Sequence, residues 1–275
     1  MAGEKQKEKI CIITASYPVI GGMGSVIRKL IDVLSSQYKV AVLSMKMMKN
    51  SNIAYHYELT PSSKLRVIFS PWNILTIMFY ELNGLLWCLS LRKIGFKKFL
   101  IQDASFTGFF ATVIGIITRA KVYIFDYGQI MVLNKPNYSE SFVSKYHNKI
   151  LMKVYIKILN VMVNFSLRYC YKFFACHPSM GKLACTLGLE SKRLVLYNFP
   201  IDTSVFAPYE EKRKSMIRKE LGINEKEILI TYIGRLSPDK GLPYLIKAAR
   251  HLQAKYIGHI KFLIIGEGPL KKWVL

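Results

Sequence analysis

The sequence predicts an α/β protein with a doubly wound parallel sheet, followed by the beginning of a second domain of the same kind. Compact apolar runs rich in β-branched residues, such as residues 10–15 and 228–233, are typical of buried parallel strands. Segments with apolar residues at helical spacing follow these runs, and this alternation indicates parallel sheets covered by helices. Half of the 275 residues are apolar, which is enough for a sizeable core.

The chain is expected to begin with a strand at residues 10–15, a glycine-rich loop and a helix over residues 26–34. Gly21 and Gly22 lie in this loop, where the lack of side chains lets the backbone approach a bound phosphate closely. A flexible turn is the alternative interpretation of the same glycines. Strands are next expected at residues 40–44, 54–59 and 65–69, and a broad apolar helix at residues 72–91.

Asp126 directly follows a strand that the sequence predicts at residues 122–125. A polar residue just beyond the carboxyl end of a parallel strand points into the crevice where α/β folds bind ligands. Asp126 is therefore a candidate catalytic residue, and capping of the following turn is its alternative role. The preceding strand is expected at residues 99–102, with a connecting helix at residues 107–118.

Residues 144–169 are predicted to form one long helix with lysines at every fourth position from Lys145 to Lys157. No acidic residue occurs between Glu140 and Glu190, so the lysines repel one another along one face. We expect this face to contact an anionic membrane surface, with an ordinary solvated face as the alternative. The apolar positions are expected on the core side; they are Ile150, Val154, Ile158, Val161 and Phe165.

A strand at residues 173–176 leads to His177, where the next helix begins, and Gly188 is a natural end for that helix. A lone His before Pro is more often a capping residue than a catalytic one. A last strand at residues 194–197 then enters a polar, charged segment, and we place the domain boundary there. The first domain covers residues 1–200 and the second covers residues 201–275.

The stretch Gly234-Arg235-Leu236-Ser237-Pro238-Asp239-Lys240-Gly241 connects a predicted strand to a predicted helix. Arg235 and Lys240 place two cations beside a helix N-terminus, where unpaired backbone N–H groups and the helix dipole both favour an anion. The sequence therefore predicts a diphosphate site in this loop, and a solvated strand-to-helix turn is the alternative.

The formal net charge of +23 favours anionic partners such as acidic lipids, phosphorylated substrates or nucleic acid. Most of the excess lies in residues 1–200, which contain 26 Lys and Arg against 9 Asp and Glu. Nucleic acid is disfavoured because no helix-turn-helix, finger or RNA-binding signature accompanies the charge. The five cysteines have no metal-ligand spacing, so we expect reduced thiols, no metal and a cytoplasmic protein, peripheral on the inner membrane face.

Four sets of residues span nearly the whole chain, and they are Gly21-Gly22, Asn198-x3-Asp202-x3-Phe206, Gly234-Arg235-Leu236 with Lys240-Gly241, and Gly266-Glu267-Gly268-Pro269. Together they resemble the retaining glycosyltransferases of the GT-B fold in the large "group 1" family. The resemblance implies two Rossmann-like domains, of which the first binds a lipid-linked or glycan acceptor and the second most of a nucleotide-sugar donor. It also implies that Arg235 and Lys240 contact the donor diphosphate, with the Gly21 and Gly22 backbone on its other side. The donor is a co-substrate, and no further cofactor is expected.

Two departures from the family pattern lead to further expectations. Family members often have His-Asp where this chain has Phe125-Asp126, and the family continues to a Glu-x7-Glu motif, whereas this chain stops at Leu275. We therefore expect an incomplete second domain that is poorly stable over residues 210–275, and no sugar transfer by this chain alone. A separate chain is one way to supply the rest. The alternative function is that of a non-enzymatic relative that docks on an acidic membrane or on a partner protein.

Overall fold

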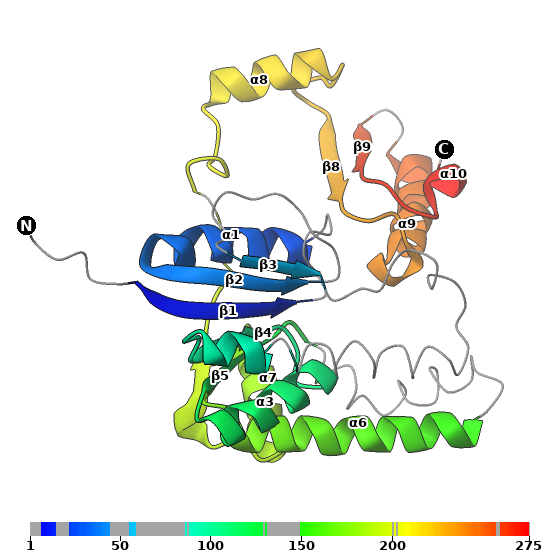
Figure 1. Cartoon of the computed structure of the whole chain (residues 1–275). Helices are drawn as coiled ribbons and strands as arrows, with labels where there is room; N and C mark the ends of the chain where they lie inside the picture. Colours follow the sequence, from blue (N-terminus) through cyan, green and yellow to red (C-terminus); the bar gives the residue numbers. More distant parts are fainter. Residues whose placement is uncertain are drawn as a thin grey trace, which may run out of the picture. The chain divides into compact units, whose positions relative to one another are not determined.

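The computed structural model describes residues 7–14, 22–44, 55–58, 86, 88–128, 130, 149–199, 201, 203–256 and 259–274. The chain divides into two compact units, Met1–Pro200 and Ile201–Leu275. Each unit contains a parallel sheet of its own (Figure 1). The α/β fold with parallel sheets that the sequence predicts is thus confirmed.

The sheet of the first unit has seven strands in the order β3-β2-β1-β4-β5-β6-β7, and all neighbouring strands are parallel. The strands are β1 (Glu8–Thr14), β2 (Tyr38–Ser44), β3 (Tyr55–Glu58), β4 (Lys98–Ile101), β5 (Lys121–Asp126), β6 (Lys172–Ala175) and β7 (Leu194–Leu196). The chain extends the sheet first on one side of β1 and then, from β4 onwards, on the other. In doubly wound sheets ligands bind at such a switch point, outside the carboxyl ends of the strands.

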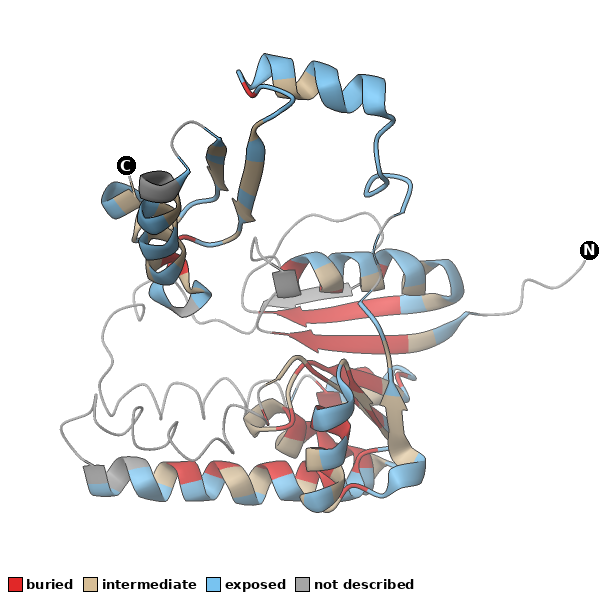
Figure 2. Cartoon of the chain, turned by 180° about the vertical axis from the view of Figure 1, so that it is seen from behind, coloured by how far each residue is buried: buried red, intermediate tan, exposed pale blue. Residues whose placement is uncertain are grey.

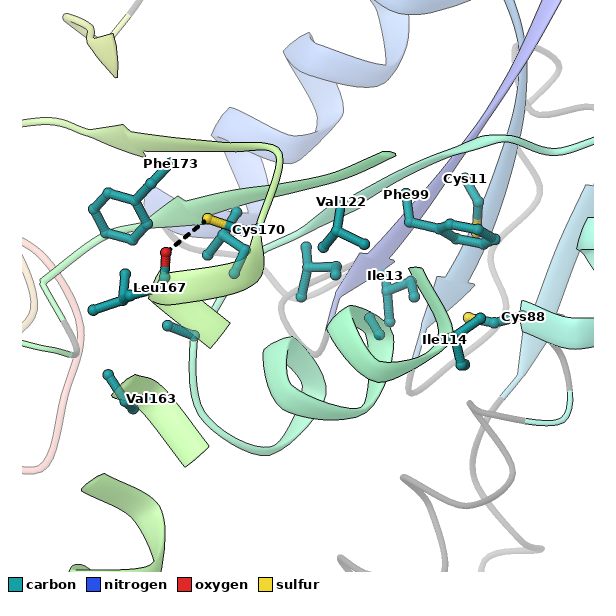
Figure 3. Close-up of a cluster of buried hydrophobic side chains, with 14 of the residues drawn as sticks. Cys11, Ile13, Cys88, Phe99, Ile114, Val122, Val163, Leu167, Cys170 and Phe173 are labelled. Atoms are coloured by element: carbon teal, nitrogen blue, oxygen red, sulfur yellow. Dashed lines mark hydrogen bonds between the residues drawn. The ribbon is translucent and has the colours of Figure 1, made fainter. Parts of the chain in front are cut away.

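Helices cover both faces of this sheet, and β1 shows why its sequence is a continuous apolar run. The helices of the first unit include α1 (Gly22–Gln37), α3 (Phe106–Thr118), α6 (Lys149–Tyr169) and α7 (Pro178–Thr186). Ile10 and Ile12 belong to the buried cluster that includes α1, whereas Cys11 and Ile13 belong to the cluster that includes α3, α6 and α7. Successive side chains of a strand point to opposite faces, so both sets are buried. Figure 3 shows the second of these clusters around Phe99 and Phe173.

The helix α6 differs from the sequence prediction in the face that it buries. The predicted core positions Ile150, Val154, Ile158 and Val161 are 78%, 51%, 48% and 63% exposed. The buried side is formed instead by residues one or two positions away, which are Ile156, Leu159, Val163, Ser166 and Leu167. The prediction was wrong for these four residues, whereas Phe165, the fifth, is partly buried and its ring lies 5.0 Å from that of Phe109 on α3. The reason is that α6 has apolar residues around most of its circumference, and periodicity alone does not say which of them meet α3. Figure 2 shows buried and exposed positions alternating along α6.

A left-handed residue ends α3, because Arg119 has a φ of 53° at the helix C-cap. Among the described non-glycine residues, Arg119 alone has a positive φ. This conformation costs an L-amino acid on the order of 1 kcal/mol relative to glycine, which is the usual residue at such a position. The backbone N–H of Arg119 donates to the Ile116 carbonyl, and that of Ala120 to the Gly115 carbonyl.

The second unit contains a two-stranded parallel sheet and mostly exposed helices. Its elements are α8 (Glu211–Glu220), β8 (Ile228–Ile233), the 3-10 turn η3 (Pro238–Lys240), α9 (Leu242–Lys255), β9 (Ile260–Ile265) and α10 (Lys271–Val274). The helix α8 was not predicted, because its sequence is so polar that none of its residues is buried. Arg218 fastens the end of α8 to the turn before β8 by donating from Nη2 to the carbonyls of Asn224 and Glu227 (2.6 and 2.5 Å).

Several predicted elements lie partly or wholly outside the described residues. The predicted strand at residues 65–69 and most of the helix at residues 72–91 are among them, although residues 88–93 are helical. In the part of the chain that the structure describes, none of the helices combines the length and the apolar character that crossing a bilayer requires.

Candidate functional site

The loop between β8 and α9 contains the predicted diphosphate site, and it pairs with the chain that follows β9. The Gly234 N–H donates to the Ile265 carbonyl (3.0 Å), and the Leu236 N–H donates to the Glu267 carbonyl (2.9 Å). A third bond runs from the Leu270 N–H to the Leu236 carbonyl (3.0 Å). The two chain segments therefore continue the β8–β9 pairing beyond the ends of the strands.

Gly266 and Gly268 make this close pairing possible. A Cβ atom on Gly266 would lie 1.9 Å from the Gly234 carbonyl oxygen, and one on Gly268 would lie 2.4 Å from the Leu236 carbonyl oxygen. Both distances are well inside van der Waals contact, so only glycine allows the two backbones to approach this closely. The Gly-Arg-Leu and Gly-Glu-Gly-Pro motifs, which are distant in the sequence, are thus two sides of one loop pair.

Arg235 is held in place by its neighbours on the loop. Leu236 and Ser237 are 4% and 5% exposed and anchor the loop, whereas Arg235 itself is exposed. The Tyr232 hydroxyl donates to the Arg235 carbonyl (2.9 Å), and Arg235 Nε donates to Ser237 Oγ (3.1 Å). The guanidinium group is therefore oriented by its own loop, which lowers the entropy that a ligand contact would cost.

Lys240 is the last residue of η3 and lies two residues before Leu242, where α9 begins. Gly241 has a φ of 73°, and its carbonyl accepts hydrogen bonds from the Tyr244 and Leu245 N–H groups. Leu242 is fully buried and fixes the first turn of α9, while Lys240 is exposed. Both predicted cations thus project from one rigid loop at a helix N-terminus, an arrangement that favours phosphate oxygens.

In the first unit, Gly22 is the first residue of α1, four residues before the helix start that the sequence predicts. Gly22 and the buried Gly24 therefore belong to the first helical turn and not to the loop. The helix follows β1, the strand next to the switch point of the sheet. Gly21 lies outside the described residues, so its predicted role stays a prediction, as does the contact of Gly22 with a ligand.

Asp126 is the last residue of β5 and is fully buried. Its Oδ1 accepts a hydrogen bond from the Gly128 N–H (2.7 Å), and its Oδ2 accepts one from the Ile130 N–H (3.0 Å). These are the contacts of the capping role that the sequence leaves open as the alternative. Asp126 has no exposed surface, so a direct catalytic contact would require the turn after β5 to move, and the catalytic role stays a prediction.

Neutral polar groups also lie at the carboxyl edge of the first sheet. The sequence did not indicate them. Thr14 Oγ1 donates to the side-chain oxygen of Gln102, which directly follows β4 and is 7% exposed. Among the described residues, Gln102 Nε2, Tyr127 Oη and Tyr197 Oη are buried without a hydrogen-bond partner of good geometry. Each of these residues directly follows a strand in the structure. The rule that singles out Asp126 did not find Gln102 and Tyr197, because the sequence places them inside the predicted strands 99–102 and 194–197.

The two tyrosines of this edge lie close together. Burial raises the pKa of Tyr127, and the neighbouring Gln102 side chain opposes part of that rise. Burial also raises the pKa of Tyr197, and the nearby Tyr127 adds to the effect. Phe199 stacks on Tyr127 with ring centroids 5.7 Å apart. The edge therefore offers uncharged hydrogen-bonding groups beside an aromatic surface.

His177 caps a helix, as the sequence favours. It is the N-cap of α7, and its Nδ1 accepts a hydrogen bond from the Ser179 N–H (3.2 Å). Within the described ranges, no group of three His, Cys, Asp or Glu side chains is placed to hold a metal ion.

A family comparison matches the second unit. Residues 213–274 match the family described as "Glycosyl transferases group 1", and this range contains Arg235, Lys240 and both glycines of the loop pair. An uncharacterised glycosyltransferase of Methanocaldococcus jannaschii is 30% identical over 87 residues, which are 31% of this chain and 21% of that protein.

The whole chain is similar in fold to solved glycosyltransferases. HepE of Anabaena, solved with UDP and glucose, is 15% identical and aligns with 97% of this chain at a TM-score of 0.59. WaaG, a glycosyltransferase involved in lipopolysaccharide biosynthesis, is 10% identical and aligns with 96% of this chain at a TM-score of 0.63. This chain spans 64% of the length of the HepE chain and 65% of that of WaaG. The resemblance that the motifs indicate is thereby confirmed: the second unit carries the signature of the group 1 glycosyl transferases, and the chain has the fold of GT-B glycosyltransferases.

Proposed function

We propose that this protein is a glycosyltransferase that takes a sugar from a nucleotide-sugar donor and transfers it, with retention, to a lipid-linked or glycan acceptor at a membrane surface. The observation that carries the proposal is the loop pair of the second unit. It presents Arg235 and Lys240 on a backbone anchored by Leu236, within the range that matches the family.

The chemistry of the loop suits the leaving group of such a reaction. When the bond between the sugar and the nucleoside diphosphate breaks, negative charge grows on the diphosphate. Two cations that are already in place stabilise that charge without having to reorganise during the reaction. The nucleotide sugar is a co-substrate, and this role requires no metal and no further cofactor.

The proposed donor is supported by a protein of similar fold, and the proposed acceptor is supported by side chains of the first unit. Structures of HepE, which shares the fold, were solved with UDP and with UDP-glucose, which supports a nucleotide-sugar donor here. The uncharged groups of Gln102, Tyr127 and Tyr197 suit the hydroxyl groups of an acceptor, because buried polar atoms gain most from a partner. In the first unit, Gly21, Gly22 and Asp126 are proposed as further site residues.

The donor part is tested by binding. We expect UDP to bind the 275-residue chain, and the Arg235→Gln/Lys240→Gln variant to bind it about 10- to 100-fold more weakly, the range of two charge-assisted contacts. The control is Arg250→Gln/Lys247→Gln, which removes the same two charges from the exposed surface of α9. Titration calorimetry measures both. Equal affinity in the two double variants would contradict the proposed site.

The membrane part rests on α6. Its exposed surface combines Ile150, Val154, Ile158 and Val161 with the exposed Lys153 and Lys157, and the helix contains no acidic residue. A helix face with apolar and cationic residues fits the interface of an anionic bilayer. We expect sedimentation with vesicles that contain phosphatidylglycerol, weakened by salt and by Val154→Ser/Ile158→Ser. Equal sedimentation with charged and uncharged vesicles would contradict the electrostatic part of this proposal.

A non-enzymatic binding module is the second candidate, because of what occupies the end of β5. Phe125, at the position where the family often has His, stacks on Phe174 with ring centroids 4.1 Å apart. A partly buried aromatic stack at this position contributes packing and no proton transfer. UDP binding without any sugar transfer or donor hydrolysis would favour the binding module, whereas turnover would favour the enzyme. The absence of turnover by these 275 residues stays a prediction.

A further inference from the structure

A basic pocket lies at the opposite edge of the first sheet, near the amino ends of β5 and β6. It has a volume of about 630 Å³ and is lined by residues from the ends of α3 and α6 and the beginnings of these strands. Five cations line it, namely Arg119, Lys121, Lys172, Lys192 and Arg193, and its lining contains no Asp or Glu. The pocket is separate from Asp126 and Gln102, which lie at the carboxyl edge of the same sheet.

Two of the five cations have a structural explanation. Arg193 Nη1 donates to the Arg168 and Cys170 carbonyls (2.8 and 3.1 Å) and so caps the carboxyl end of α6. Arg193 and Lys192 also form ion pairs with Glu190, at 3.2 and 2.8 Å. Cations are expected at a helix carboxyl terminus, because they offset the exposed carbonyls.

The other three cations have no carboxylate partner among the described residues. Lys172 Nζ donates to the Lys192 carbonyl (2.8 Å), and Lys121 Nζ contacts the Tyr171 hydroxyl (3.3 Å) and lies 4.4 Å from the Tyr171 ring centroid. Lys121 helps to lower the pKa of Glu8, but the ion-pair partner of Glu8 is Lys98. Clustered cations repel one another, so an anion in the pocket would lower the energy of all three.

A buried hydroxyl group also lines the pocket without a partner. Thr112 is fully buried on α3, and its Oγ1 makes no hydrogen bond to any of the described residues. An unpaired hydroxyl at such a position costs free energy that a bound acceptor oxygen would recover. Because Thr112 is neutral and buried, it is independent of the cations as an indication of a ligand.

Arg119 adds a third indication. It occupies the left-handed C-cap of α3, where glycine would be less strained, and its side chain has no hydrogen-bond or ion-pair partner among the described residues. The side chain of Arg119 therefore makes no polar contact with the described part of the fold that would offset the backbone strain. A ligand in the pocket that Arg119 lines would account for the arginine.

We propose that this pocket binds a phosphate group, with Arg119, Lys121 and Lys172 as its cationic partners and the Thr112 hydroxyl as a donor. Phosphate is the anion class with enough oxygen acceptors to engage a guanidinium, two ammonium groups and a hydroxyl together. The phosphate belongs either to a small soluble molecule or to a lipid headgroup. Tyr169, at the end of the exposed face of α6, is 49% exposed and lines the pocket, which places the pocket next to the proposed membrane face. The proposal does not depend on sugar transfer or on the Arg235 loop.

The test uses variants that keep the fold. Arg119→Gly removes the cation and relieves the strained backbone, so we expect unchanged or higher resistance to urea but about tenfold weaker phosphate binding, as for one charge-assisted contact. Thr112→Val tests the hydroxyl at nearly constant volume and should weaken binding by a smaller factor. The control Arg28→Gln/Lys29→Gln removes two exposed charges from α1 and should bind like the original chain.

Two sets of probes separate the possible sources of the phosphate. The soluble arm titrates inorganic phosphate and glycerol 3-phosphate by calorimetry. The lipid arm compares phosphatidylcholine vesicles that contain phosphatidic acid with vesicles that carry the same charge as oleate. A loss in Arg119→Gly that is confined to the soluble probes assigns a soluble ligand, and a loss confined to phosphatidic acid assigns a headgroup. The proposal is overturned if neither probe binds, if oleate is bound equally well, or if Arg119→Gly and the α1 control lose affinity alike.

Discussion

The sheet of the first unit is buried on both faces, whereas the sheet of the second unit is only partly covered. Ile12 and Ile124 in the central strands of the first sheet are fully buried, but Ile228 and Ile233 in β8 are 60% and 76% exposed. Both large apolar clusters contain residues of the first unit alone. The family signature and the candidate diphosphate loop therefore lie on the part of the molecule with the smaller core.

This difference shows two ways to make a rigid site. The carboxyl edge of the first sheet is fixed by seven paired strands and by side chains such as Asp126, whose two oxygens hold the next turn. The loop of the second unit is fixed mainly by backbone hydrogen bonds to the Gly266–Pro269 segment and by the buried Leu236. Side-chain packing dominates in the first unit and close backbone approach in the second, and the predictions below separate the two.

The largest effect is expected from a matched pair of Phe→Ala substitutions. Phe173→Ala in β6 removes a fully buried ring and should destabilise the first unit by about 3–5 kcal/mol. Phe262→Ala in β9 removes a half-buried ring and should cost less than about half of that. Urea unfolding followed by circular dichroism measures both. Equal losses would mean that the second unit has more core than its exposed surface indicates.

A glycine substitution should affect the second unit next most strongly. Gly266→Ala places a methyl group where the Gly234 carbonyl lies, so we expect a loss of about 1–3 kcal/mol as the two segments separate. Gly222→Ala is the control, because Gly222 has a φ of 65° but no neighbouring atom near its Cβ position. Its cost should be limited to about 1 kcal/mol of backbone strain. If both variants lose the same amount, close approach is not what Gly266 provides.

Asp126→Asn tests how much the first unit depends on polar side chains at its edge. Asparagine can accept only one of the two hydrogen bonds and turns its NH2 group toward the other donor, so we expect a loss of about 1–2 kcal/mol. Thermal unfolding measures the loss, and UDP titration shows whether binding in the second unit is unaffected. Unchanged stability would contradict the capping role, because the turn after β5 would then not depend on both carboxylate oxygens.

The smallest expected effect is a pH dependence confined to the first unit, where all five cysteines lie. Burial raises the pKa of Cys170 to about 12, from an ordinary value of 9.0. Above pH 9 the unfolded chain loses this proton and the folded chain keeps it, so stability falls as the pH rises toward 12. We expect Cys170→Ala to reduce the decline between pH 8 and about 9.7 by about 1 kcal/mol. An identical decline in both proteins would show that Cys170 does not report on the folded core.

The elements that depend on local sequence were predicted well. Strands such as β5 and β8, the helix α7 with its His177 cap, and the linkage of Arg235 and Lys240 to a strand-to-helix turn all follow from apolar runs, capping residues and glycines. These signals act between residues that are close in the chain. The helix α8 was missed because its polar sequence has no apolar face to read.

Features that depend on contacts between distant segments of the chain could not be predicted from the sequence. The sequence placed Arg235 and Lys240 on one loop and determined a doubly wound α/β chain with the motifs of a glycosyltransferase. Only the tertiary structure decided that Ile150 and Val154 face outward, that Gly266 meets Gly234, and that Arg119 and Lys121 line a common pocket. The physical reason is that periodicity fixes the spacing of side chains on one element, whereas exposure and partners depend on which other elements pack against it.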